Sequence, residues 1–238
     1  MKKKSRTFAM MAGATVALSA CSNPAGPAPM DTPTDRVPSS SNRYLPLSLG
    51  AKWTYHATDP TSGASGETYS TVEALEDLGG SKAGIKAFRV RSSTLTGSTV
   101  NWQQDLTTSV VRQREQFFDL AGSMQSDYIF EPDRLRLDES PEHLVLGATW
   151  TENHGANLDD LVNRIQKPVT FTAVWTVEAV DEPVTVPAGT FSCLRVRRVQ
   201  TGFASSDEMH YFARHIGQVK QAGPEPKELT SYSIPPAN

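Results

Sequence analysis

The sequence predicts a mainly antiparallel β protein, built as two pseudo-repeated halves that form one curved sheet, half-barrel or sandwich, with one short helix. Apolar and polar residues alternate with period two over 168–178, as in a strand with one covered and one wet face. Short blocks recur in the same order in both halves of the chain. Pro and Gly residues separate the alternating stretches, where they favour turns.

The N-terminus is expected to be an export signal over residues 1–20. A basic stretch at 2–6 precedes an apolar run over 8–18, which is too short to span a bilayer. The following Leu-Ser-Ala-Cys resembles the lipobox of bacterial lipoproteins, in which the cysteine is acylated and begins the mature chain. Cys21 is therefore the predicted lipid attachment site, since two or more acyl chains anchor a protein firmly. An ordinary secretory signal is the alternative.

After the anchor, residues 21–42 are expected to form a disordered tether. Pro, Ser and small polar residues dominate this stretch, and they bury too little apolar surface to fold. Ser22 follows the cysteine in place of Asp, which in lipoproteins favours the outer membrane. The β domain is then expected over 43–238, with halves at about 43–140 and 141–238.

Internal similarity suggests that the two halves arose by duplication. Each half contains a Gly-x-x-Trp block, which we interpret as a structural corner whose glycine permits a turn and whose tryptophan fills the core. Chance reuse of strand and turn sequences is the alternative. The matching pairs are "LSLGAKWTY" (from Leu47) with "LVLGATWTE" (from Leu144), "TVEALED" (Thr71) with "TVEAVDE" (Thr176), and "GIKAFRVR" (Gly84) with "GTFSCLRVR" (Gly189).

Strands are expected wherever apolar side chains share one parity. In the first half these are the stretches around 53–57, 88–90 and 100–102, and in the second half they are 168–178, 190–201, 208–215, 218–222 and 227–234. The stretch 113–124 is expected to be a strand followed by a loop, with a short helix as the alternative.

The one predicted helix spans 157–165. Asn157 can cap its N-terminus and Pro168 would end it. The apolar stripe that supports a helix consists of Leu158, Leu161, Val162 and Ile165, which share one face at helical spacing.

The charge of the chain argues against a nucleic-acid-binding protein. The formal charge is −3, and without the basic stretch at 2–6 the remaining 19 basic and 26 acidic residues give −7. A general nucleic-acid binder needs a basic face.

Besides Cys21 the chain has one cysteine, Cys193, which is expected to be a buried thiol without an internal disulfide.

No catalytic or metal signature is evident, so no catalytic residue, metal or cofactor is predicted. Glu208 and His210 share a strand face, but His215 lies on the opposite parity, and the spacing matches no helical zinc motif. The basic stretch at 195–198 is expected to be a solvated strand face, with contact to an anionic headgroup as the alternative.

Three motifs resemble a broad group of bacterial lipoproteins of unassigned function. They are the stretch from Tyr44 to Tyr55, "VPAGTF" at 186–191 and "YFARHIGQVK" at 211–220. The resemblance implies a curved antiparallel sheet similar to half-barrel lipid or lipoprotein carriers, and it supplies no catalytic residues. Related chains often have Gly before the Ile-Gly pair, whereas this chain has Arg214-His215, which puts the form of that turn in doubt.

Together these observations predict a membrane-anchored, non-enzymatic envelope lipoprotein that binds an apolar ligand or a protein partner, a lipid or an envelope protein. A concave sheet could hold acyl chains, although the tryptophans could equally form ordinary core. A surface-displayed hydrolase is the alternative function. The candidate ligand-lining residues are Trp53, Trp102, Trp150 and Trp175.

Overall fold

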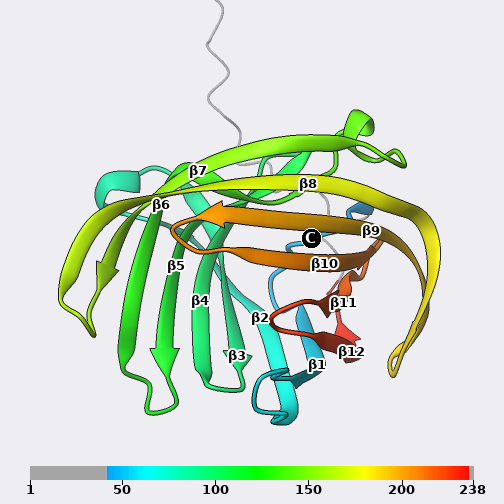
Figure 1. The fold of residues 1–238 in the computed structure, drawn as a ribbon, viewed down its shortest axis with the longest axis horizontal. Helices are drawn as coiled ribbons and strands as arrows, with labels where there is room; N and C mark the ends of the chain where they lie inside the picture. Colours follow the sequence, from blue (N-terminus) through cyan, green and yellow to red (C-terminus); the bar gives the residue numbers. More distant parts are fainter. Residues whose placement is uncertain (1–41, 236–238) are drawn as a thin grey trace, which may run out of the picture. The chain divides into compact units, whose positions relative to one another are not determined.

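The sheet closes on itself into a barrel of twelve antiparallel strands. In the computed structural model, which describes residues 42–235, each strand pairs with the next along the chain and β12 pairs back with β1 (Figure 1). The predicted signal peptide (1–20), the lipid attachment at Cys21 and the tether up to residue 41 lie outside the described residues.

The strands differ widely in length, and β8 is the longest. They are β1 (Lys52–Thr58), β2 (Ser65–Asp77), β3 (Lys86–Thr94), β4 (Gly97–Asp105), β5 (Ser109–Asp119), β6 (Met124–Asp138), β7 (Thr149–Asp160), β8 (Ile165–Val186), β9 (Gly189–Gly202), β10 (Ser206–Ala213), β11 (Gly217–Ala222) and β12 (Lys227–Ser233). In Figure 1, β3 to β6 run down the page whereas β8 to β10 run across it.

The closed barrel corrects the predicted curved sheet, half-barrel or sandwich. The register runs from Lys52↔Ser233 to Ala57↔Lys227 along β1 and β12, so the first and last strands satisfy each other's backbone groups. A closed barrel leaves no free sheet edge. Alternation along single strands does not encode this pairing of the two ends, which is why the sequence predicted strands but not closure.

The predicted helix at 157–165 is wrong, since this stretch is the hairpin of β7 and β8. Asp160 pairs with Ile165, and a short turn over 161–164 joins the strands. The Asp160 carboxylate accepts hydrogen bonds from the backbone and side chain of Asn163, so it shapes a turn instead of the first turn of a helix. The long β7–β8 ladder overrides the local helical spacing.

Among residues 42–235 no helix is long and apolar enough to cross a membrane.

The two Gly-x-x-Trp blocks build the same corner at the starts of β1 and β7. Gly50 and Gly147 have φ angles of 80° and 81°, a left-handed conformation that favours glycine. Gly50 N–H donates to Val72 O at 2.9 Å, and Gly147 N–H donates to Val177 O at 2.9 Å. The blocks are thus equivalent in local structure, while their common origin stays a prediction.

One end of the barrel is covered by residues 43–50, here called the closing segment. The Arg43 guanidinium contacts Asp105 at 3.0 Å and Glu139 at 3.0 Å, and the Arg43 carbonyl accepts a hydrogen bond from His215 N–H. These partners come from the end of β4, the residue after β6 and the β10–β11 turn. The closing segment therefore spans the barrel end and holds three of its connections together.

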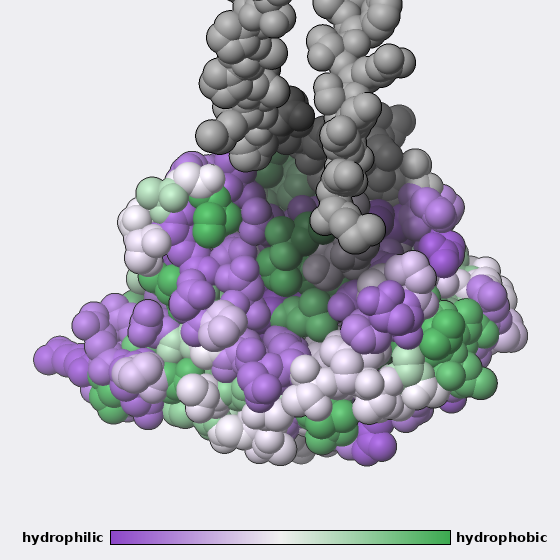
Figure 2. All heavy atoms as spheres, turned by 90° about the horizontal axis from the view of Figure 1, so that it is seen from above, coloured by the Kyte–Doolittle hydropathy of each residue, from purple (hydrophilic) through white to green (hydrophobic). Residues whose placement is uncertain are grey.

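Apolar packing is concentrated next to the closing segment. Tyr44 and Leu47 are buried there, and Trp53, Leu137, Leu229 and Phe212 belong to the clusters around them. On the face seen in Figure 2, hydrophobic side chains form small groups among hydrophilic ones.

Candidate binding cavity in the barrel lumen

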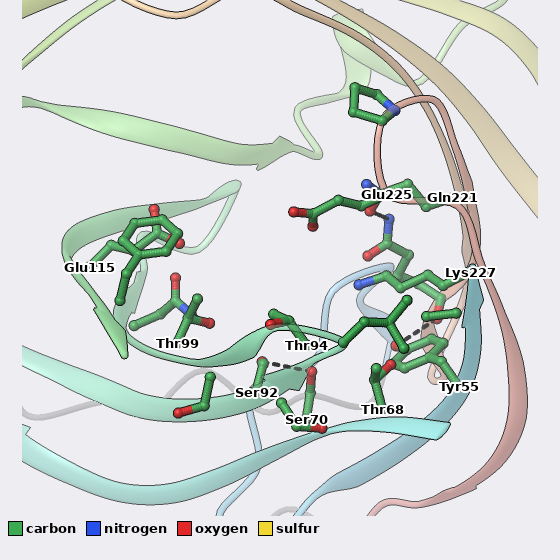
Figure 3. A pocket seen from close by; sticks show the side chains of 18 of the residues that line it. Tyr55, Thr68, Ser70, Ser92, Thr94, Thr99, Glu115, Gln221, Glu225 and Lys227 are labelled. Atoms are coloured by element: carbon green, nitrogen blue, oxygen red, sulfur yellow. Dashed lines mark hydrogen bonds between the residues drawn. The ribbon is translucent and has the colours of Figure 1, made fainter. Parts of the chain in front are cut away.

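A cavity of about 800 Å³ occupies the barrel lumen. It extends from Leu45 and Leu47 of the closing segment to the turns at the opposite end of the barrel, including Thr96 and Glu225, which are exposed. This opposite end is called the mouth. The volume lies within the range of small-molecule sites, roughly 300–1,000 Å³. Figure 3 shows Lys227 and Glu225 projecting into the cavity across from Glu115.

Hydroxyl and amide groups form one wall of the cavity. They come from alternate positions of β2, β3 and β4, which place their side chains on one face of the sheet. Ser70 Oγ and Ser92 Oγ share a hydrogen bond of 2.7 Å across the β2–β3 ladder (Figure 3). The residues of this hydroxyl wall are Thr68, Ser70, Ser92, Thr94, Thr99, Asn101 and Gln103.

The wall formed by β5 and β6 is cationic. Arg112 and Arg134 are direct partners in the β5–β6 register, an arrangement of like charges that destabilises a sheet. Glu115 forms ion pairs with both guanidiniums, at 3.3 Å to Arg134. Burial is the main cause that lowers the pKa of Arg112 to about 9, and the neighbouring arginines add to it, while Glu115 opposes them.

Arg136 and Lys227 face the lumen without a carboxylate partner. Neither side chain makes an ion pair or hydrogen bond to any residue in the described part of the chain. The Lys227 ammonium lies 4.8 Å from the centre of the Tyr55 ring, a cation–π contact. Burial, together with the nearby Arg136, lowers the pKa of Lys227 to about 8, so the two cations influence each other through the lumen.

Glu208 and His210 form a hydrogen-bonded pair on β10. His210 Nε2 lies 3.1 Å from Glu208 Oε2, and the Gln218 amide nitrogen lies 2.8 Å from His210 Nδ1. Burial lowers the pKa of His210, so the ring is neutral, accepting from Gln218 at Nδ1 and donating to Glu208 at Nε2. The predicted shared face of Glu208 and His210 is confirmed, while His215 lies in the β10–β11 turn with φ 65°.

Glu208 stays ionised inside the barrel. Burial opposes ionisation, but the hydrogen bond from His210 and the positive charges of Arg198 and Arg134 hold the pKa of Glu208 far below its usual range. Arg198 is itself buried against the Trp175 ring, 3.9 Å from Glu208. The basic stretch at 195–198 is therefore divided: Arg195 and Arg197 pair with outer carboxylates, and Arg198 points inward, contrary to the predicted solvated face.

A smaller aromatic compartment of about 140 Å³ adjoins the cavity and shares Glu115, Phe117 and Arg134 with it. His154 and Phe171 stack there with ring centres 4.8 Å apart. Its remaining lining residues are Tyr128, Phe130, Gln200, Phe203 and Ala204.

The four candidate tryptophans do not line one site. Trp53 lines the cavity and donates from Nε1 to the Ile216 carbonyl. Trp150 and Trp175 stack on each other at 6.0 Å within an apolar cluster beside the closing segment. Trp102 lies on the other face of β4, in a separate small cluster, where Nε1 donates to Glu76.

Other candidate reactive groups are structural. Cys193 is buried as predicted, and burial raises the pKa of its thiol to about 12. Across residues 42–235, no group of three or more His, Cys, Asp or Glu side chains has an arrangement that could hold a metal ion.

Comparison with known proteins gives little further information. No protein-family model matches the chain, and no curated protein does. A solved candidate lipoprotein of Parabacteroides distasonis ATCC 8503 is similar at 11% identity and a TM-score of 0.42, covering 81% of this chain and 99% of that one. A candidate exported protein of Bacteroides fragilis NCTC 9343 with a YmcC-like fold shows 12% identity, a TM-score of 0.42 and coverage of 79% and 98%. Values this low support no inference about function.

Proposed function

We propose that this protein is a lipid-anchored, non-enzymatic envelope lipoprotein that binds a polar small molecule in the barrel lumen. The observation that carries the proposal is the cavity of about 800 Å³ lined by hydroxyl, amide and charged groups. Ligand sites are concave and place a few polar groups to fix the ligand. The envelope location rests on the lipobox-like sequence that ends at Cys21.

The cavity lining favours a polar ligand over the apolar ligand expected from the sequence. An acyl chain would have to lie against the hydroxyl wall and the β5–β6 arginines, where it would strip water from polar groups without replacing their hydrogen bonds. A polar ligand with several hydroxyl groups would instead satisfy Ser70, Ser92 and Thr99, which line the cavity.

A non-enzymatic role fits the pairing of the lumen groups better than the hydrolase alternative. Both ring nitrogens of His210 are engaged, by Glu208 and Gln218, so the ring has no free nitrogen with which to activate a nucleophile. A hydrolase needs a nucleophile or a water held within hydrogen-bond reach of its base. Glu208 is held ionised by its cations, so it is a poor proton donor.

Equilibrium dialysis against an envelope extract, followed by mass spectrometry of the retained solutes, tests this function. The lumen is blocked with Ser70→Trp, and the matched control is Tyr69→Trp, because Tyr69 is an exposed neighbour on the outer face of β2. The wild type and Tyr69→Trp should retain the same solute, and Ser70→Trp should lose it. Retention by all three proteins, or by none, would contradict a lumen binding site.

A further inference from the structure

The cavity is lined by four cationic side chains and five carboxylates, and three of the carboxylates, Asp59, Asp119 and Glu225, lie at the mouth. Deeper in the lumen, Glu115 forms ion pairs with Arg112 and Arg134. Glu208 forms an ion pair with Arg198 and a hydrogen bond with His210. Arg136 and Lys227 remain without an anionic partner among the described residues. Both side chains are partly exposed to the cavity, so an anion that enters the lumen can reach them and offset the cost of their partial burial.

Unpaired hydrogen-bond donors mark the same place. The Nε atoms of Arg112, Arg134 and Arg136 are buried and have no hydrogen-bond partner. Arg112 itself is 7% exposed. Each such donor costs free energy in a folded protein unless something accepts from it. These Nε atoms are closed off from the cavity, so a solute would meet the terminal guanidinium nitrogens, and those of Arg136 have no partner among residues 42–235.

Arg136 and Lys227 approach the lumen from opposite walls. They lie on β6 and β12, which are half the barrel apart in the strand order, and yet both line the cavity. Arg136 lowers the pKa of both Lys227 and Tyr55, so the three groups share one region. Glu225 of the β11–β12 turn raises the pKa of Lys227, but it is an exposed mouth residue and makes no ion pair with it.

We propose that the lumen binds an anionic, hydroxyl-bearing solute, whose carboxylate or phosphate group lies between Arg136 and Lys227 with Arg112 as the third cation. This proposal rests on the function proposed above and names the ligand class. Guanidiniums bind carboxylates and phosphates through paired, charge-assisted hydrogen bonds, and lysine adds a compact charge. The hydroxyl wall faces the rest of the solute, which suits an acidic sugar or a polyol phosphate.

Isothermal titration of the purified protein with glucuronate, inorganic phosphate and glucose tests the proposal. Glucuronate and glucose both carry hydroxyl groups and differ in the carboxylate, while phosphate separates the two kinds of anion. We expect glucuronate or phosphate to bind at least 10-fold more tightly than glucose. Arg136→Met and Lys227→Met should each weaken anion binding about 10- to 100-fold, the effect of losing a charge-assisted hydrogen bond. Lys52→Met, on the exposed outer face of β1, should bind like the wild type.

The melting temperatures of Arg136→Met and Lys227→Met show whether a loss of binding comes from unfolding. Removing one of these unpaired, half-buried cations relieves its repulsion with the other, so Arg136→Met and Lys227→Met should melt at or above the wild-type temperature without ligand. Their loss of binding would then reflect the site and not unfolding.

The remaining outcomes separate this proposal from the function on which it rests. Glucose binding as tight as glucuronate binding, lost in Ser70→Trp, would overturn the anion site and leave lumen binding intact. If Arg136→Met and Lys227→Met both bound anions as tightly as the wild type, the proposed position of the anionic group between these two residues would be wrong. Binding of no probe, together with no solute retained in dialysis, would overturn both proposals.

Discussion

The closed end and the mouth of this barrel are built by the same strands with opposite chemistry. On β12, Leu229 is fully buried in the apolar cluster, and Lys227, two residues earlier on the same face, is a lumen cation without a carboxylate. On β10, Phe212 is buried in an apolar cluster, and His210, two residues earlier on the same face, is a polar lumen residue bonded to Glu208. The closed end therefore stabilises a barrel whose other end holds charges that oppose folding. A protein can keep such charges at a functional site when the rest of the structure offsets them.

The largest effect should come from the ion pairs that fasten the closing segment. Glu139 accepts from the Arg43 guanidinium and from the backbone N–H groups of Tyr44 and Leu45. Glu139→Ala would leave a buried guanidinium with only part of its partners, and we expect a loss of about 3 kcal/mol in the free energy of unfolding. Urea denaturation measures it. Glu142→Ala, at an exposed nearby position, is the control and should change little.

Truncating one side chain at each end of the barrel should show that the closed end contributes more to the free energy of unfolding than the mouth. Leu47 is 6% exposed in the apolar cluster and also borders the cavity, so Leu47→Ala should cost about 2 kcal/mol, at the low end for a buried leucine. Thr94→Ala, at the mouth end of β3, should cost less than about 0.5 kcal/mol. Equal losses in urea denaturation would mean that the mouth contributes as much to stability as the closed end.

The smallest predicted effect is a pH dependence that originates in the lumen. In the folded protein the pKa of Lys227 falls from 10.5 to about 8, so above pH 8 the unfolded chain binds a proton that the folded chain has released. Stability should therefore rise with pH between about 8 and 10, by on the order of 1 kcal/mol.

Comparing Lys227→Met with Lys52→Met tests whether Lys227 causes the rise in stability between pH 8 and pH 10. Lys227→Met should lack this part of the rise, while Lys52→Met should keep it, and both are measured by urea denaturation at pH 8 and pH 10. A rise of the same size in all three proteins would assign it to other groups.

Sequence patterns predicted the local structure better than the site. The alternation over 168–178 lies within β8, and the stretch 113–124 is a strand followed by a turn and the start of β6. The apolar stripe at 157–165 failed because Leu158 is buried on a strand, while Leu161 and Val162 lie at an exposed turn. Strand pairing with a distant segment, which no local window contains, decided that outcome.

A concave ligand site was predicted, but its polar and cationic lining was not, because parity does not say which face of a strand is the lumen. Arg134 and Arg136 alternate with Leu135 and Leu137, a pattern equally compatible with arginines in solvent and leucines in the core. Only closure makes the arginine face an interior.

The pairing of β1 with β12 has a consequence for how the chain could be rearranged. Lys52 and Ser233 are partners in the ladder, so the first and last strands meet at the closed end. Pro235 lies beside Gly50 of the closing segment, so a linker from the end of β12 to residue 42 could keep that segment, and new ends could be opened in the β3–β4 turn at the mouth, an exposed site of the kind that tolerates circular permutation. Such a permuted protein would keep every strand pair, and its two ends would lie at the mouth instead of at the closed end.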